Sequence, residues 1–419
     1  CHVAGVYHLG LVATLSKPNG TIAFEARRVQ LAVAVVFGHA VKHIYGSGLR
    51  TVVMPEIKIG LSLNASEFGS LATARSLTGG VTTLVAGYLG DRFSNRAGLM
   101  LAISLSLMGG SLFLTGLAPN YTTMLVVMFL VGIGPALHHP PALSALSRRF
   151  SDSRGFAVSL HGTGGIAGEV IGPVFVAMIL GFMMWRDVLK VSLFPAVIAA
   201  IFVWAMMRTS TGDHTDRTVS SLRDYFGSLS RLLRNNAMLF LVIAAALNAA
   251  GNSAVGEFLP VYLREDLDFS PTRVAVYLSL TRVAGLGFQP IMGFFSDRFS
   301  RKAILVPTLA ATAGLSLLLP VASSGVPLFL IVAITGAFSF SIHHIFIAAA
   351  LDVARGKVQS TVVSLIYGAG LLATFSPYVA GIIADHFDDV RSAFLYGGSV
   401  IIIPTIMLAW LKFPEKGAS

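Results

Sequence analysis

Charged residues are scarce in this 419-residue sequence: they make up only 12% of it, whereas 54% of the residues are hydrophobic. The mean hydropathy is +0.75. A soluble globular chain has about 25% charged residues. The composition therefore excludes an ordinary soluble protein and indicates a membrane protein with many spans.

Cysteine is almost absent as well. A single cysteine, Cys1, excludes an intrachain disulfide and a cysteine-based metal cage. The sequence also lacks a glycine-rich phosphate loop followed by Lys-Ser/Thr, so we do not expect ATP to power the protein. No catalytic domain or cofactor motif is recognisable, and we expect a protein that is not an enzyme and carries no cofactor.

Long apolar segments predict an all-α membrane protein with twelve transmembrane helices, since each span needs about 20 mostly apolar residues. The predicted spans are 29–55, 66–90, 97–117, 121–147, 155–181, 186–207, 237–263, 271–296, 303–322, 326–352, 357–384 and 391–412. The long polar connection includes a predicted amphipathic helix near 222–233. The expected organisation is an unassigned tail (1–28), a six-helix bundle (29–207), a cytoplasmic linker (208–236), a second six-helix bundle (237–412) and a tail (413–419).

The basic residues set the expected orientation. With the amino terminus inside, cytoplasmic segments hold 20 Lys and Arg residues and outer loops hold 6. This asymmetry predicts that both termini are cytoplasmic, in the inner (cytoplasmic) membrane. Although the net charge is +10, it is spread over short loops, so no basic domain for nucleic acid is expected.

A short turn occurs twice. The segment from Gly87 to Arg96 contains Asp91-Arg92, and 206 positions later the sequence repeats the pattern with Gly293 and Asp297-Arg298. At the same offset His138 falls on His344. Because six helices return the chain to its starting side, the sequence predicts two parallel repeats.

These turns, and the two sets of six spans around them, resemble the major facilitator superfamily of secondary transporters over nearly the whole chain from residue 29. Ser94 and Ser300 stand where that family usually has glycine. The resemblance implies two pseudo-symmetric bundles, with helices one, four, seven and ten lining a cavity. It also implies that the turn residues act in gating, as latches between the halves: Gly87, Asp91, Arg92, Arg96, Gly293, Asp297 and Arg298. The alternative is that these charged turns only fix the topology.

Helix four and helix five carry a narrower likeness. The segment 130–140, which contains His138-His139-Pro140, and the glycine-rich segment 162–165 are similar to the branch containing fosmidomycin-resistance exporters. Gly168-x-x-x-Gly172-Pro173 resembles the antiporter motif of the superfamily, which implies a gating role for Gly172 and Pro173. This likeness implies export.

Cations occur inside the predicted spans, where each costs roughly 2.5–3.5 kcal/mol unless it faces protein or water. Arg75 and Arg282 lie near the expected midplane, and His39, Lys42 and His43 share one face of the first helix. They indicate a cavity that binds an anionic group. The alternative is that internal carboxylates neutralise the arginines, which then never meet substrate.

Histidines and amides complete the candidate substrate site. The resemblance implies that His138 and His344 approach the cavity. Histidine titrates near neutral pH and so suits a proton relay. We also consider this role for His161. Asn248 and Asn252, one turn apart, suit either substrate binding or helix bridging. Helix packing is the alternative for the histidines, and no local ligand spacing indicates a metal site.

Two carboxylates fall within spans. Glu169 in helix five is the first choice for a group that loads and releases a proton, and Glu257 in helix seven is the second, with the alternative that it reaches outer water. Together these residues predict a monomeric, proton-coupled antiporter that exports a small organic, anionic or drug-like molecule by alternating access. The alternatives are a proton symporter for uptake of a carboxylate or phosphorylated metabolite, and a membrane receptor that binds its ligand without moving it.

Overall fold

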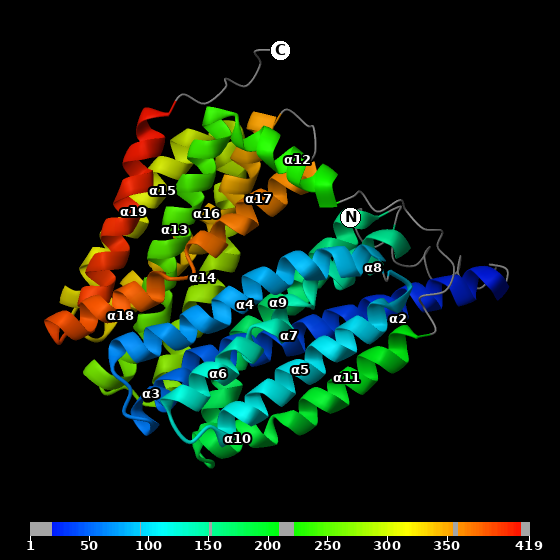
Figure 1. Ribbon diagram of the computed structural model, residues 1–419. Coiled ribbons are helices and arrows are strands. Elements are labelled where there is room, and N and C mark those ends of the chain that lie inside the picture. The colour runs from blue at the N-terminus through cyan, green and yellow to red at the C-terminus, as the bar shows by residue number, and fades with distance from the viewer. Residues whose placement is uncertain (1–18, 93, 151–152, 209–221, 355–358, 412–419) are drawn as a thin grey trace, which may run out of the picture.

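The computed structural model describes residues 19–92, 94–150, 153–208, 222–354 and 359–411, and within these ranges every regular element is a helix. Residues 1–18 of the predicted amino-terminal tail, all of the predicted tail 413–419, and residues 209–221 of the predicted linker lie outside the described residues. Figure 1 shows the helices arranged as two groups. The predicted all-α fold is confirmed.

The first group contains the helices before the linker. In chain order they are α2 (Asn19–His43), the π-helix η1 (Ile44–Val53), α3 (Met54–Gly60), α4 (Ala65–Arg92), the 3-10 turn η2 (Ser94–Arg96), α5 (Ala97–Leu117), α6 (Tyr121–Val131), α7 (Ile133–Ala136), α8 (His139–Arg149), α9 (Arg154–Leu180), α10 (Trp185–Val191) and α11 (Leu193–Met207).

The second group follows α12 (Leu222–Leu233), which occupies the segment where the sequence predicts an amphipathic helix. It consists of α13 (Asn236–Val261), the π-helix η3 (Tyr262–Asp266), α14 (Pro271–Arg298), α15 (Arg301–Leu318), the 3-10 turn η4 (Leu319–Val321), α16 (Val326–Ala354), α17 (Gln359–Leu372), α18 (Ser376–Phe387) and α19 (Ser392–Trp410).

Eleven helical stretches of the described residues are long and apolar enough to cross a membrane. The remaining predicted span, 66–90, corresponds to α4, which is 28 residues long and includes Glu67, Arg75, Asp91 and Arg92. One of these charged residues, Arg75, lies in the interior of α4 and is a candidate site residue. The chain is a multispanning membrane protein.

The two groups converge at one end of the molecule and diverge at the other. They meet near α3 and α18 and lie apart toward α8 and α12 (Figure 1). Contacts between the groups run mainly from α4 to α18 and from α9 to α14. We refer to the end at α3 and α18 as the closed end.

Helix starts follow local sequence signals. Asn120, Asn235, Ser270 and Ser300 are N-caps, and each side chain accepts a hydrogen bond from a backbone N–H of the first turn. Ser300 accepts from the Ala303 N–H at 3.0 Å. Ser300 therefore has a definite role at this position, because its side chain caps the first turn of α15.

Helix four is interrupted beside its histidines. It consists of α6, α7 and α8, with Pro140 and Pro141 in the first turn of α8. Proline lacks a backbone N–H and its ring clashes with the carbonyl four residues earlier, so the break falls on the amino-terminal side of the pair. The interruption places His138 and His139 at the junction between two helical pieces.

Glycines bring α9 against the first helix. A Cβ atom at Gly164 would lie 2.5 Å from the Val36 carbonyl oxygen, and one at Gly168 would lie 2.3 Å from the Ala40 carbonyl oxygen. A Cβ at Gly172 would lie 2.9 Å from the Cα of Ile44. These three glycines recur every four residues, so they form one face of α9 that allows close backbone contact. The contact sets Glu169 directly beside His43.

Candidate functional site

A cavity of 390 Å³ lies within the first group of helices. Its charged and titratable lining comes from four different spans: Lys42, His43, Arg75, His139 and Glu169. Most of the remaining lining is apolar and includes Met54, Ile57, Met108, Leu112 and Met128. This volume and lining suit a small organic molecule with one anionic group and an apolar part.

Arg75 of α4 is paired with a carboxylate of the other group. Its Nη2 donates to Oε1 of Glu257 on α13 at 2.8 Å. The side chains are 18% and 8% exposed, so Glu257 is more deeply buried than the arginine, which lines the cavity. The sequence left open whether an internal carboxylate neutralises Arg75. The structure shows that Glu257 is such a carboxylate and that Arg75 also lines the cavity.

Glu169 of α9 lies between an imidazole and a guanidinium group. Its Oε1 is 3.0 Å from Nδ1 of His43, and its Oε2 is 3.8 Å from Nη1 of Arg282 on α14. The Arg282 guanidinium also lies over the ring of Phe340, 4.4 Å from the centroid. Glu169 therefore links the first helix to the second group, as Glu257 links the second group to α4.

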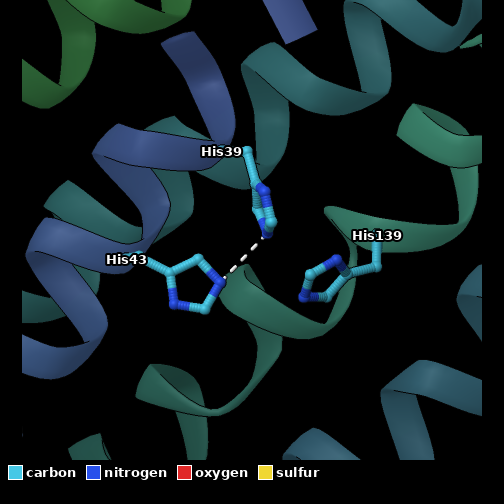
Figure 2. Close-up of side chains that lie close together, drawn as sticks. All are labelled: His39, His43 and His139. Atoms are coloured by element: carbon cyan, nitrogen blue, oxygen red, sulfur yellow. Dashed lines mark hydrogen bonds between the residues drawn. The ribbon is translucent and has the colours of Figure 1, made fainter. Parts of the chain in front are cut away.

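Histidines gather around Lys42. The Lys42 Nζ donates to Nε2 of His139 at 2.7 Å and lies 3.3 Å from Nε2 of His43. His39, one turn before His43, places its Nε2 3.0 Å from the His43 Nε2. Figure 2 shows these imidazoles pointing toward a common centre. Ligand nitrogens of His39, His43 and His139 all lie within 4.8 Å of one another.

His138 and His161 lie beside this cluster, next to His39. His138 is fully buried, with its Nδ1 3.4 Å from the Ser104 hydroxyl. The His161 ring stacks on that of His39 with centroids 3.7 Å apart, and its backbone carbonyl accepts from the His39 Nδ1 at 2.7 Å. Both side chains therefore pack against the histidine cluster rather than line the cavity.

The remaining substrate candidates lie in the second group, away from the cavity lining. Asn252 donates to the Asn248 backbone carbonyl and side-chain oxygen, both at 2.9 Å, and accepts from Ser339 at 2.7 Å. His344 is exposed, with its Nδ1 3.2 Å from the Phe340 carbonyl on its own helix. Asn248, Asn252 and His344 are not among the residues that line the cavity with Lys42 and Arg75.

The duplicated turns can be compared only in part, because the side chains of Asp91 and Arg92 lie outside the described residues. In the second copy Asp297 pairs with Arg301 at 2.5 Å, and Arg301 also pairs with Asp352 of α16 at 2.7 Å. Arg96 and Arg298 are exposed. A Cβ at Gly293 would meet no atom within 4 Å.

The closed end has polar contacts that sequence reasoning missed. Arg264 donates to Glu56 at 2.6 Å and Lys58 donates to Glu265 at 2.7 Å. The Asp385 carboxylate accepts from the backbone N–H groups of Ala65 and Ser66, at 2.7 and 2.8 Å, and so caps the start of α4. Each contact joins residues about 200 or more positions apart, and no local pattern signals such a pairing.

Comparison with known proteins supports a common family. The sequence profile of the Major Facilitator Superfamily matches residues 43–367 and 241–419. The chain is 22% identical to the probable L-galactonate transporter of Escherichia coli (strain K12), over 91% of this chain and 90% of that protein. It is 24% identical to the fosmidomycin resistance protein of the same organism, over 88% of this chain and 91% of that protein.

The fold also matches a solved structure. A crystal structure of a mutant of the nucleoside transporter NupG superposes with a TM-score of 0.78 at 12% identity, covering 90% of this chain and 99% of that one. At this identity the likeness concerns the fold alone.

Proposed function

The chain belongs to the Major Facilitator Superfamily, and on this premise we propose that it is a secondary active transporter that couples movement of a small organic anion to protons. Alternating access would expose the cavity to one side of the membrane at a time. The observation that carries the proposal is the Arg75–Glu257 ion pair, because its arginine faces the cavity while its carboxylate belongs to the other group of helices.

An anion in the cavity would compete with Glu257 for Arg75. Since a buried carboxylate without its cationic partner is costly, Glu257 then takes up a proton. Anion binding and proton binding would therefore favour each other, and the contact between α4 and α13 would weaken. We infer that this pair is the coupling device, with Glu169 holding His43 and Arg282 in place.

This geometry favours symport, in which anion and proton move together. The probable L-galactonate transporter carries, by its name, a carboxylate, which supports an anionic substrate. Antiport with export is the second candidate. It is favoured by the similarity to the fosmidomycin resistance protein and by the Gly168-x-x-x-Gly172-Pro173 segment.

The placement of the basic residues supports a bacterial inner-membrane orientation in which α12 and both termini are cytoplasmic and the closed end is external. In that orientation the two groups are joined on the outside. The cytoplasmic turns at Asp91-Arg92 and Asp297-Arg298 would engage when the molecule alternates. We propose that the unit of transport is the monomer, because one chain supplies both groups of helices that alternating access requires.

The test is transport in sealed proteoliposomes containing the full chain. Radiolabelled L-galactonate and an alkyl phosphonate are offered under an imposed pH gradient. Symport predicts accumulation in the compartment toward which protons flow, and antiport predicts accumulation in the opposite compartment. Saturable binding without accumulation under either gradient would contradict transport.

Glu257→Gln tests the coupling residue. We expect anion exchange to persist while accumulation driven by the pH gradient falls about tenfold or more, because an amide cannot carry the proton. Glu67→Gln is the matched control, since Glu67 lies at the exposed start of α4 and accepts from the Asn64 N–H. Gradient-driven accumulation equal to wild type in Glu257→Gln would remove this residue from the mechanism.

A further inference from the structure

Three imidazoles from two separate helices converge beside the cavity. His39 and His43 lie one turn apart on α2, and His139 begins α8 after the break in helix four. Figure 2 shows the three rings facing one another. Their ligand nitrogens lie within 4.8 Å of one another, and His43 and His139 line the cavity. The cluster is therefore reachable from the transport pathway.

Hydrogen bonds of the Nδ1 atoms determine which ring nitrogens of the cluster carry a proton and which keep a lone pair. The His39 Nδ1 lies 2.7 Å from the His161 carbonyl oxygen, which can only accept, so this nitrogen carries the proton. The His43 Nδ1 lies 3.0 Å from the Glu169 carboxylate, which likewise accepts from it. In the neutral rings both Nε2 atoms then carry lone pairs, and these atoms are only 3.0 Å apart. Two facing lone pairs repel unless a proton, as in a hydrogen bond between His43 and His39, or another cation lies between them.

Lys42 supplies one cation to this cluster. An ammonium group only donates, so the Nε2 of His139, at 2.7 Å, accepts from Lys42. The His43 Nε2 is 3.3 Å from the same ammonium. The three imidazoles therefore direct lone pairs toward one point. The Lys42 ammonium already lies close to this point.

We propose that His39, His43 and His139 form a binding site for a divalent transition metal ion such as Zn²⁺, and that the Lys42 ammonium competes with the metal for it. Neutral imidazole is a favourable ligand for Zn²⁺, Co²⁺, Ni²⁺ and Cu²⁺. The proposal departs from the sequence-based expectation of no metal site, because the ligands come from helices about 100 residues apart in the chain.

The distances suit such an ion. With Zn–N bonds of about 2.0–2.1 Å in tetrahedral geometry, ligand nitrogens are about 3.3 Å apart. The observed 3.0 Å between the His39 and His43 nitrogens requires a shift of only a few tenths of an ångström. The ligand nitrogen of His139 must move closer to those of His39 and His43. At present the three nitrogens lie within 4.8 Å of one another. We infer that side-chain rotations supply both movements.

The surroundings resemble a metal site in a second respect. Histidine ligands of metals usually donate their other N–H to a carboxylate or a backbone carbonyl. His43 has the carboxylate of Glu169 and His39 has the carbonyl of His161. Three protein ligands leave a fourth position, which would be filled from the cavity by water or by an anionic ligand.

Metal titration of the purified full chain tests the proposal. The protein is prepared in detergent without a polyhistidine tag and titrated with Zn²⁺ by calorimetry. It is also titrated with Co²⁺, whose visible absorption reports tetrahedral nitrogen coordination. We expect one saturable site in each titration. No saturable binding in either would overturn the site, without bearing on anion transport, which the proteoliposome assay measures separately.

Variants assign the ligands and the competitor. His39→Ala, His43→Ala and His139→Ala should each weaken binding at least about 100-fold, while Glu169→Gln should weaken it about 10–100-fold. Lys42→Met should tighten binding about tenfold, because it removes the competing positive charge. His386→Ala is the control, since His386 is an exposed histidine of α18. Unchanged affinity in the three alanine variants would refute the assignment, and weaker binding in Lys42→Met would refute competition.

Thermal unfolding in detergent, measured without metal, identifies any variant that fails to fold. Because each ligand is tested separately, and the Co²⁺ spectrum of the unmutated chain stands alone, one such failure does not remove the test.

Discussion

At the scale of single residues, the two membrane arginines show how buried charge is arranged. Arg75 and Arg282 belong to different groups of helices, and each is paired with a glutamate of the opposite group, at 2.8 and 3.8 Å. Pairing removes most of the cost of placing an arginine at this depth. Because Arg75 also lines the cavity, its carboxylate partner can be exchanged for an anionic ligand.

Arg75→Ala separates the structural role of this residue from substrate binding. We expect anion transport to fall by at least about tenfold and the protein to lose about 3–5 kcal/mol of stability, because Glu257 is left buried without its partner. Transport in proteoliposomes and thermal unfolding in detergent measure the two effects.

The double variant Arg75→Ala/Glu257→Gln is the matched comparison. It removes both charges, so stability should return most of the way to wild type while transport stays low. Normal anion transport in either variant would exclude Arg75 from the substrate site.

At the scale of helices, close packing of α9 on the first helix places the polar groups of the site. Gly168 has its Cβ position 2.3 Å from the Ala40 carbonyl oxygen and 2.8 Å from the His43 Cβ. Since no side chain fits there, Gly168→Ala must push α9 away from α2. We expect a loss of about 1–3 kcal/mol in stability and reduced transport, because Glu169 moves from His43.

Gly162→Ala is the control on the same helix. A Cβ at Gly162 would meet no atom within 4 Å, so this change should be neutral or stabilise the helix by up to about 1 kcal/mol. Thermal unfolding of the two variants side by side measures the difference. Equal stability would show that the spacing of α9 from α2 does not depend on this glycine.

At the scale of the whole molecule, the closed end holds the two groups of helices together. Across the α4 to α18 contact, a Cβ at Gly69 would lie 2.2 Å from the Pro377 carbonyl oxygen, and one at Gly381 would lie 2.3 Å from the Ala65 carbonyl oxygen. Ion pairs of Glu56 and Lys58 with the second group reinforce this contact. Opening the cavity toward this end requires all of these contacts to separate.

Gly69→Val should separate α4 from α18 at the closed end. Thr73, which is buried and donates to the Thr374 carbonyl at 3.0 Å, reports the opening when replaced by cysteine. Because the chain has a single native cysteine, Thr73→Cys can be studied in a Cys1→Ser background. We expect a membrane-impermeant maleimide to label Thr73→Cys about tenfold faster when Gly69→Val is present.

Gly110→Val provides the comparison, since a Cβ at Gly110 of α5 would meet no atom within 4 Å. It should leave the labelling rate of Thr73→Cys unchanged. Labelling that is equally slow with Gly69→Val would mean that the groups adjust without separating at this end.

The membrane class, the helices and the family likeness could all be predicted from the amino-acid sequence. Span length and apolar composition depend on consecutive residues, and helix starts depend on a cap and the next three positions, so local pattern suffices for both. The linker helix at Leu222–Leu233 was predicted from its amphipathic pattern, which is also local. The prolines Pro140 and Pro141 are likewise a local signal for the interruption of helix four beside its histidines.

Which charged groups meet depends on the three-dimensional packing of the helices and could not be predicted. Sequence placed Arg75, Glu169, Glu257 and Arg282 at suitable depths, but pairing depends on how helices from the two groups are rotated and how closely they approach. The contact of His139 with Lys42, across 97 positions, has the same origin. Such contacts are set by packing at distant positions, including the glycines of α9, and so they have no local signature in the chain.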